Sequence, residues 1–110
     1  VHGANHVGIV YNFHHGHGDI ETFEDDFAAM LPFLLCVNLN GMTAPETLNG
    51  KTKILPIGSG KHELAMIKIV LDSGYTGPIG ILDHISTADA KLSLRANLSG
   101  LKKIRAQLTK

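Results

Sequence analysis

Three histidines and an asparagine follow one strand-like segment near the start of the chain. The segment from Val7 to Gly18 has the sequence VGIVYNFHHGHG, and its polar end carries Asn12, His14, His15 and His17. Histidine changes charge near neutral pH and is the commonest metal ligand, so this cluster suits proton transfer or metal binding. We therefore expect function to lie just after this strand.

Two asparagines occupy the corresponding place in a second apolar segment. The segment Phe33 to Asn40 has the sequence FLLCVNLN, with Asn38 and Asn40 at its end. An amide donates and accepts hydrogen bonds, which suits binding of hydroxyl groups. The competing interpretation is structural, since asparagine beside Gly41 also supports a turn.

A third apolar segment, Ile79 to Leu82, ends at Asp83 and His84. Histidines and carboxylates can form a three-ligand metal site with an open position for water or substrate. Asp83 and His84, together with His15 and His17, are a possible set from which such ligands could come. Alternatively, Asp83 caps its loop and His84 is a loop histidine bonded to backbone.

Helical segments separate the three expected strands. The first begins at a capping Asp19 and is interrupted by Pro32, and the second covers His62 to Asp72 and ends at Gly74. The third is expected to begin at a capping Ser86 or Thr87. The apolar positions that we expect to face inward are Leu64, Ile67 and Leu71 in the second helix, with Met66 and Val70 alongside, and Leu94, Leu98, Leu101, Ile104 and Leu108 in the third.

The strand segments are apolar almost throughout, which predicts strands covered on both faces. Neighbouring residues at a strand end point to opposite sides, so His14 and His15 are expected to diverge. Residues 41 to 60 fit a long loop better than a further full element.

Three strands alternating with three helices predict an α/β fold with a parallel sheet. In such folds ligands meet the carboxyl ends of the strands. The three polar clusters all fall at such ends, and we expect one shared site.

The composition excludes several partners. Ten basic and ten acidic residues give a formal charge of zero, so neither nucleic acid nor an anionic membrane is an expected partner.

The single cysteine, Cys36, is expected to be a buried thiol. The longest apolar stretch is far shorter than a membrane helix, which predicts a soluble protein. The chain begins at Val1, as a processed product or fragment would, so we predict no compartment.

Three stretches of the sequence, GIVYNFHHGH, LLCVNLNGM and KILPIGSGKHELAMIKIVLDSGYTGPIGILDH, resemble a known family. They are similar to the last three βα units of sugar phosphate isomerase/epimerase-like proteins in the xylose isomerase-like TIM-barrel superfamily. The resemblance implies that residues 1–110 are the C-terminal portion of a (β/α)8 barrel whose N-terminal half is absent. An isolated piece would expose unpaired strand edges, and we expect it to be marginally stable or to self-associate.

The resemblance also implies positions for the chemistry. Catalytic relatives hold a divalent metal (Mn, Mg, Co or Zn) with acidic and histidine side chains. The aspartate position and the histidine three residues later fall on Asn12 and His15, and the next strand's positions fall on Asn38 and Asn40. The final glutamate position falls at or near Leu82, with Asp83 beside it. Amides are weaker metal ligands than carboxylates and supply no compensating charge.

Two functions follow from the resemblance and the residues together. The first is a sugar isomerase or epimerase that moves a proton on a carbohydrate with metal assistance. The second is a non-catalytic carbohydrate-binding barrel that has lost the metal-binding acids. The predicted site residues are His15 and Asp83 for catalysis, Asn12, His14, Asn38 and Asn40 for substrate, and His15, His17 and His84 for metal. Near the second helix start, Glu63 either approaches the site or stabilises the helix dipole.

Overall fold

The computed structural model describes residues 7–43, 53–83, 85 and 87–109 of the chain. Strands β1 (Ile9–Asn12), β2 (Leu34–Leu39) and β5 (Ile79–Ile81) form a three-stranded sheet in the order β1-β2-β5, and both pairings are parallel. The α-helices are α1 (Phe23–Met30), α2 (Glu63–Asp72) and α3 (Ala90–Leu108). The predicted mixed α/β fold with a parallel sheet is confirmed.

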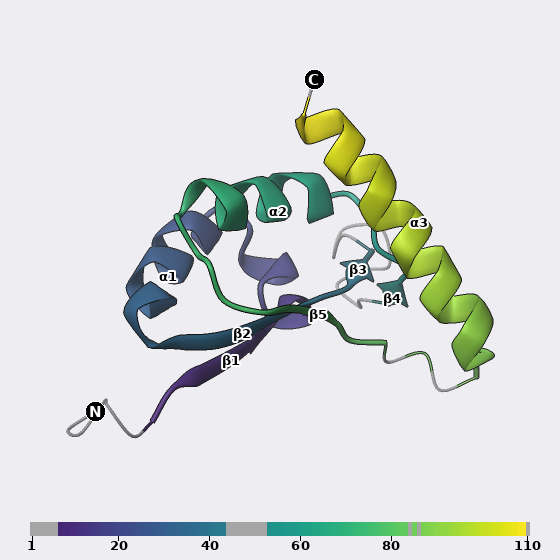
Figure 1. The fold of residues 1–110 in the computed structure, drawn as a ribbon, viewed down its shortest axis with the longest axis horizontal. Coiled ribbons are helices and arrows are strands. Elements are labelled where there is room, and N and C mark those ends of the chain that lie inside the picture. Colours follow the sequence, from purple (N-terminus) through teal and green to yellow (C-terminus); the bar gives the residue numbers. More distant parts are fainter. Residues whose placement is uncertain (1–6, 44–52, 84, 86, 110) are drawn as a thin grey trace.

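Both α1 and α2 pack against the same side of this sheet (Figure 1). The expectation of strands covered on both faces is therefore wrong. Val10 in β1 and Leu35 in β2 expose 56% and 59% of their surface. The sheet thus has one face joined to the helices and one open face.

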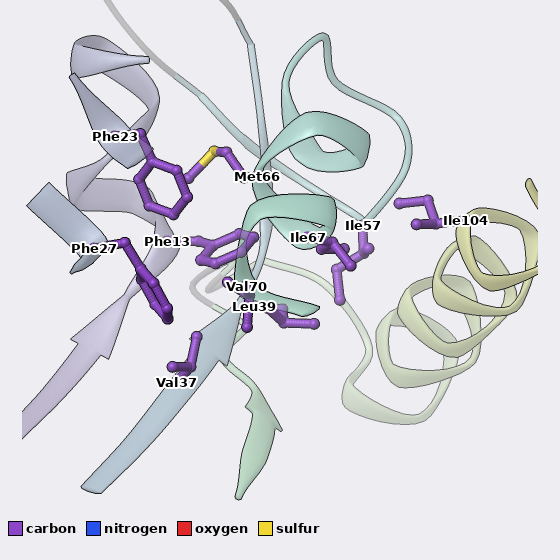
Figure 2. Close-up of a cluster of buried hydrophobic side chains, with 10 residues drawn as sticks. All are labelled: Phe13, Phe23, Phe27, Val37, Leu39, Ile57, Met66, Ile67, Val70 and Ile104. Atoms are coloured by element: carbon purple, nitrogen blue, oxygen red, sulfur yellow. The ribbon is translucent and has the colours of Figure 1, made fainter. Parts of the chain in front are cut away.

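The hydrophobic core lies between the sheet and the two helices (Figure 2). The Phe13 and Phe23 rings meet edge to face with their centroids 5.9 Å apart, and the centroids of the Phe23 and Phe27 rings are 5.8 Å apart. Met66 and Val70 of α2 complete this packing. Burial of such side chains contributes roughly 1.5–3 kcal/mol each, which attaches both helices to the sheet.

Two 3-10 turns, Phe13–His15 and His17–Asp19, follow β1, and they shift the start of α1 to Phe23. Asp19 is consequently not the helix cap that the sequence predicts. Its carbonyl instead accepts a hydrogen bond from the Thr22 amide at 3.1 Å, inside the turn.

The interruption at Pro32 is confirmed. Helix α1 ends at Met30, and Pro32 lies in a short 3-10 turn, Leu31–Phe33, that leads into β2. Proline lacks the amide hydrogen that a continuing helix would use.

Helix α2 covers almost the predicted range, and Gly74 follows it with a positive φ of 85°. This left-handed conformation suits glycine, as the sequence analysis expected. Of the apolar positions predicted for this helix, Met66, Ile67 and Val70 are buried, whereas Leu64 and Leu71 are exposed and the prediction is wrong for them.

The inward face of α3 agrees with the prediction in part. Ile104 is buried and Leu101 and Leu108 pack against the core, as expected. Leu94 and Leu98 are instead exposed, at 49% and 42% of their surface, and Ser93 and Asn97 are buried. The cap is Asp89, whose side chain accepts from the Leu92 amide at 3.0 Å, rather than Ser86 or Thr87.

The burial of Asn97 follows from how α3 meets Ile57. The Ile57 amide donates to Asn97 Oδ1 at 2.9 Å, and Asn97 Nδ2 donates to the Ser93 carbonyl at 2.9 Å. One turn later, a Cβ at Gly100 would lie 1.6 Å from the Ile57 carbonyl oxygen. A buried polar contact and a close backbone approach therefore decide which face of α3 turns inward.

The segment expected to be a long loop contains a short antiparallel ribbon. Strand β3 (Gly41–Met42) pairs with β4 (Ile54–Leu55). The ribbon directly follows β2 and leads to Ile57, which contacts α3 near Ile104 (Figure 2). No helix in the described part of the chain is long and apolar enough to cross a bilayer.

Candidate functional site

Asn12 and Asn38 meet at the carboxyl end of the parallel sheet. The two residues are register partners in β1 and β2, and Asn38 Nδ2 donates to Asn12 Oδ1 at 2.9 Å. On the other side Asn38 faces Gly80 of β5, where a Cβ would lie 2.4 Å from Asn38 Oδ1. The structure thus brings together two of the predicted substrate-binding residues, and Gly80 leaves the space that the Asn38 amide occupies.

This amide pair lies on the open side of the sheet. Val10, two residues before Asn12, is exposed, and Cys36 Sγ contacts Asn38 Oδ1 at 3.6 Å. An amide has two N–H donors and one acceptor oxygen. After the mutual hydrogen bond the pair therefore still presents donors and an acceptor, the complement of a hydroxyl group.

His14 and His15 lie together rather than on opposite sides. Their ring centroids are 4.0 Å apart with an angle of 44° between the planes. The prediction of divergence is wrong because these residues belong to the Phe13–His15 3-10 turn and not to the strand. Phe13 is fully buried and anchors the turn, while His15 is exposed and His14 half-buried.

His17 is 1% exposed, unlike the accessible ligand that the sequence analysis expected. Its ring packs against Phe13, with centroids 6.3 Å apart, and against His62 at 6.5 Å. Burial lowers the pKa of His17 below the ordinary histidine value, against the opposing effects of the Glu63 charge and the Asn40 backbone. Burial therefore favours the uncharged form of the His17 ring.

Asn40 and Glu63 are buried beside His17, each 1% exposed. Asn40 Nδ2 donates to the Gly41 carbonyl at 3.0 Å, which favours the turn-supporting interpretation of this residue. Glu63 Oε1 accepts from the amides of Gly58 at 3.2 Å and Gly60 at 2.8 Å. Glu63 Oε2 accepts from the His62 amide at 3.2 Å, so this carboxylate organises the segment that enters α2.

His62 belongs to the same cluster, and the sequence analysis assigned it no role. The residue follows a glycine-containing segment and precedes Glu63 at the helix start, which in sequence looks like an ordinary capping region. Only the folding of the Gly58–Gly60 segment over β3 places its ring near His17.

Asp83 and His84 follow the third strand of the sheet, β5. Asp83 is exposed, and its Oδ1 accepts from the Ile85 amide at 3.0 Å, the short turn expected of the structural alternative. His84 lies outside the described residues.

The described residues do not by themselves supply a metal site. No three His, Cys, Asp or Glu side chains within these ranges come together as metal ligands would. The predicted set of His15, His17 and His84 stays a prediction, because one member lies outside the described part of the chain.

A groove of about 340 Å³ lies between residues 56–59 and α3. Ser59, Ser99, Lys103 and Gln107 contribute to its lining, and none of the predicted site residues does. We therefore locate the candidate site at the strand ends, where the amide pair and the histidines gather, and not at this groove.

Comparison of the chain with models of protein families, with curated proteins and with solved structures finds no match.

Proposed function

We propose that this chain is the C-terminal part of a sugar isomerase/epimerase-like barrel and carries one side of its carbohydrate site. The observation that supports it most is the Asn12–Asn38 hydrogen bond of 2.9 Å at the carboxyl end of a parallel sheet. Ligands of α/β folds bind at such ends, and a pair of neutral amides suits neutral hydroxyl groups.

The arrangement of the sheet agrees with the barrel proposal. Three parallel strands stand in sequence order, and α1 and α2 lie on one side of them (Figure 1). Val10 of β1 is exposed. In a barrel the helices lie outside, and the opposite face of the sheet points into the interior. The open face of this sheet would then form part of the barrel interior, and β1 and β5 would pair with strands of the other half.

Within this proposal the amides orient the substrate and the exposed histidine moves the proton. Asn12 and Asn38 hold sugar hydroxyls, and His15, with the His14 ring beside it, is exposed and reaches solvent. Isomerisation moves a proton between neighbouring carbons, and imidazole is a suitable acid or base for that step. Asp83, engaged with the Ile85 amide, would need to leave its turn to take part.

The alternative function, a non-catalytic carbohydrate-binding barrel, is favoured by the same hydrogen bond. Asn12 and Asn38 occupy the positions at which catalytic relatives are expected to carry metal ligands, and here they bind each other. A bound metal would have to be held by His15, His17 and His84 or by residues of the other half.

The two functions are separated by metal and exchange measurements on the full-length protein. We expect the enzyme to contain stoichiometric Mn, Mg, Co or Zn and to incorporate solvent deuterium into a bound sugar, detected by proton NMR across a panel of aldoses and ketoses. A His15→Ala variant should lose exchange, and Lys91→Ala on α3 is the surface control. Sugar binding without metal or exchange would refute the enzyme and support the binding protein, and absence of any sugar binding would refute both.

A further inference from the structure

The charges of the chain are unevenly distributed, although their formal sum is zero. Residues 19–30, which lead into and form α1, contain five of the ten acidic residues and no lysine or arginine: Asp19, Glu21, Glu24, Asp25 and Asp26. Helix α3 contains five of the ten basic residues and no acid: Lys91, Arg95, Lys102, Lys103 and Arg105. All of these residues are exposed. The molecule therefore has one acidic and one basic helix surface.

The acidic and the basic helix lie on opposite sides of the molecule. Figure 1 shows α2 between α1 and α3, so one chain cannot bring its own acidic helix against its own basic helix. Within the part of the chain that the structure describes, no ion pair engages the acids of residues 19–30 or the cations of α3. Both surfaces are therefore available to a partner of opposite charge.

Helix α3 also exposes leucines among its cations. Leu94 and Leu98 expose 49% and 42% of their surface, and residues four apart lie on the same face of a helix. Arg95 precedes Leu98 by three positions and Lys102 follows it by four, so these two cations flank the exposed leucines. An exposed apolar strip between cations suits a partner surface that is both apolar and acidic.

The surface formed by α1 and α2 has both properties. A groove of about 160 Å³ lies between the two helices, and Leu31 and Ile69 contribute apolar side chains to its lining. Glu24 and Asp72 contribute carboxylates, and Asp72 is paired with Lys68, so Glu24 and the acids beside it on α1 carry the net charge. A cavity of roughly 150 Å³ holds a benzene ring. The groove therefore has room for one leucine side chain.

We propose that α3 of one copy of this protein docks into the α1–α2 groove of a second copy, with Leu98 in the groove and Arg95 and Lys102 against the acids of α1. Each copy carries one surface of each kind, so the contact can repeat from head to tail. Opposite charges favour this pairing over α3 with α3 or α1 with α1, where like charges would meet. The contact does not depend on the carbohydrate function. It also differs from pairing of strand edges, which uses backbone hydrogen bonds.

Sedimentation velocity of the full-length protein over a concentration series tests the contact. We expect the dissociation constant to rise about tenfold between about 50 mM and about 500 mM NaCl, because salt screens exposed charges. Two charge-reversal variants, Arg95→Glu/Lys102→Glu and Glu24→Lys/Asp25→Lys, should each weaken association about tenfold. Their equimolar mixture should associate again, because it joins an intact α3 to an intact α1–α2 surface. Lys53→Glu, at an exposed lysine outside these helices, is the control.

A protein that stays monomeric at every concentration would overturn the proposal. Association that neither salt nor the variants change would also overturn it and would indicate pairing of strand edges. Mixed variants that fail to associate would show that the two surfaces do not bind each other. A monomer that binds vesicles of anionic phospholipid through α3 would assign this helix to a membrane surface instead.

The variant Leu98→Gln tests the apolar part of the contact. It changes no charge and should also weaken association, because a polar side chain would replace the leucine in the groove. Circular dichroism establishes that each variant folds. If the α1 variant unfolds, the salt series, the α3 variant and Leu98→Gln still decide the question.

Discussion

Removal of the Glu63 carboxylate should strongly destabilise the fold. The side chain is 1% exposed and accepts hydrogen bonds from the amides of Gly58, Gly60 and His62, at 3.2, 2.8 and 3.2 Å. In Glu63→Ala these amides lose their acceptor at the point where the chain enters α2. The segment that brings His62 to His17 would then lose its anchor.

The size of the effect follows from the number and quality of the bonds. A hydrogen bond to a charged group contributes about 1.5–3 kcal/mol. The full sum over the Gly58, Gly60 and His62 amides is an upper bound, because two of the bonds are long and the wild type bears the cost of burying a charge. We expect a loss of about 3 kcal/mol in the free energy of unfolding, a large part of the roughly 5–15 kcal/mol typical of a domain.

Glu63→Gln provides a graded comparison. Glutamine keeps one oxygen, which can continue to accept from Gly58 and Gly60, but it places an NH₂ group against the His62 amide. We expect about half the loss of Glu63→Ala, or roughly 1.5 kcal/mol. The pair of variants therefore tests hydrogen bonding rather than size alone.

Urea denaturation of the wild type and both variants measures these differences, and amide hydrogen exchange at Gly58 and Gly60 locates them. Glu21→Ala, at an exposed glutamate, is the matched control. The reasoning is refuted if Glu63→Ala unfolds within about 0.5 kcal/mol of that control, the range of ordinary surface substitutions, or if exchange at the two glycines does not accelerate.

Three further predictions use other parts of the structure. Gly100→Ala should lower the melting temperature by several degrees, because a Cβ would lie 1.6 Å from the Ile57 carbonyl oxygen, whereas Gly18→Ala, with nothing within 4 Å, should not; equal melting temperatures would contradict the close approach. Burial lowers the pKa of His17 below 6.5, so the unfolded chain takes up a proton first and stability should fall as the pH drops below about 6.5; His17→Phe should flatten this part of a denaturation series at successive pH values, and an unchanged slope would exclude the assignment. Burial, together with the charges of two nearby aspartates, raises the pKa of Tyr11 from 10.0 to about 12. The contribution of Tyr11 to folding stability is therefore complete below pH 10 and is lost as the pH rises toward 12. In an ultraviolet titration the difference between wild type and Tyr11→Phe should be an ionisation step near pH 12, and a difference step near pH 10 would disprove the prediction.

The local features of the chain were predictable from short stretches of sequence. Pro32 ends the first helix because it lacks a donor, and Gly74 follows the second helix because its positive φ favours glycine. The apolar runs placed the strands, and their alternation with helices predicted the parallel sheet. Each of these depends on interactions within a few residues, which the sequence displays directly.

The inward faces of the helices were harder to predict. Leucine spacing in the last helix pointed to Leu94 and Leu98, but Asn97 and Gly100 face inward because they fit the backbone at Ile57. A count of apolar residues cannot detect a polar contact between segments 40 residues apart. The exposed leucines of this helix are consequently the clearest error of the pattern-based analysis.

Some features of the candidate site could likewise be predicted from the sequence, and others could not. The sequence by itself determined that Asn12, Asn38 and the histidines stand at strand ends, since strand periodicity and the order of elements are local properties of the chain. Only the tertiary structure decided that the two asparagines bond to each other, that the His14 and His15 rings lie side by side, and that His17 is buried near Asn40, Glu63 and His62. These relations depend on strand register and on which segments pack over which, and both are set by contacts between residues distant in sequence.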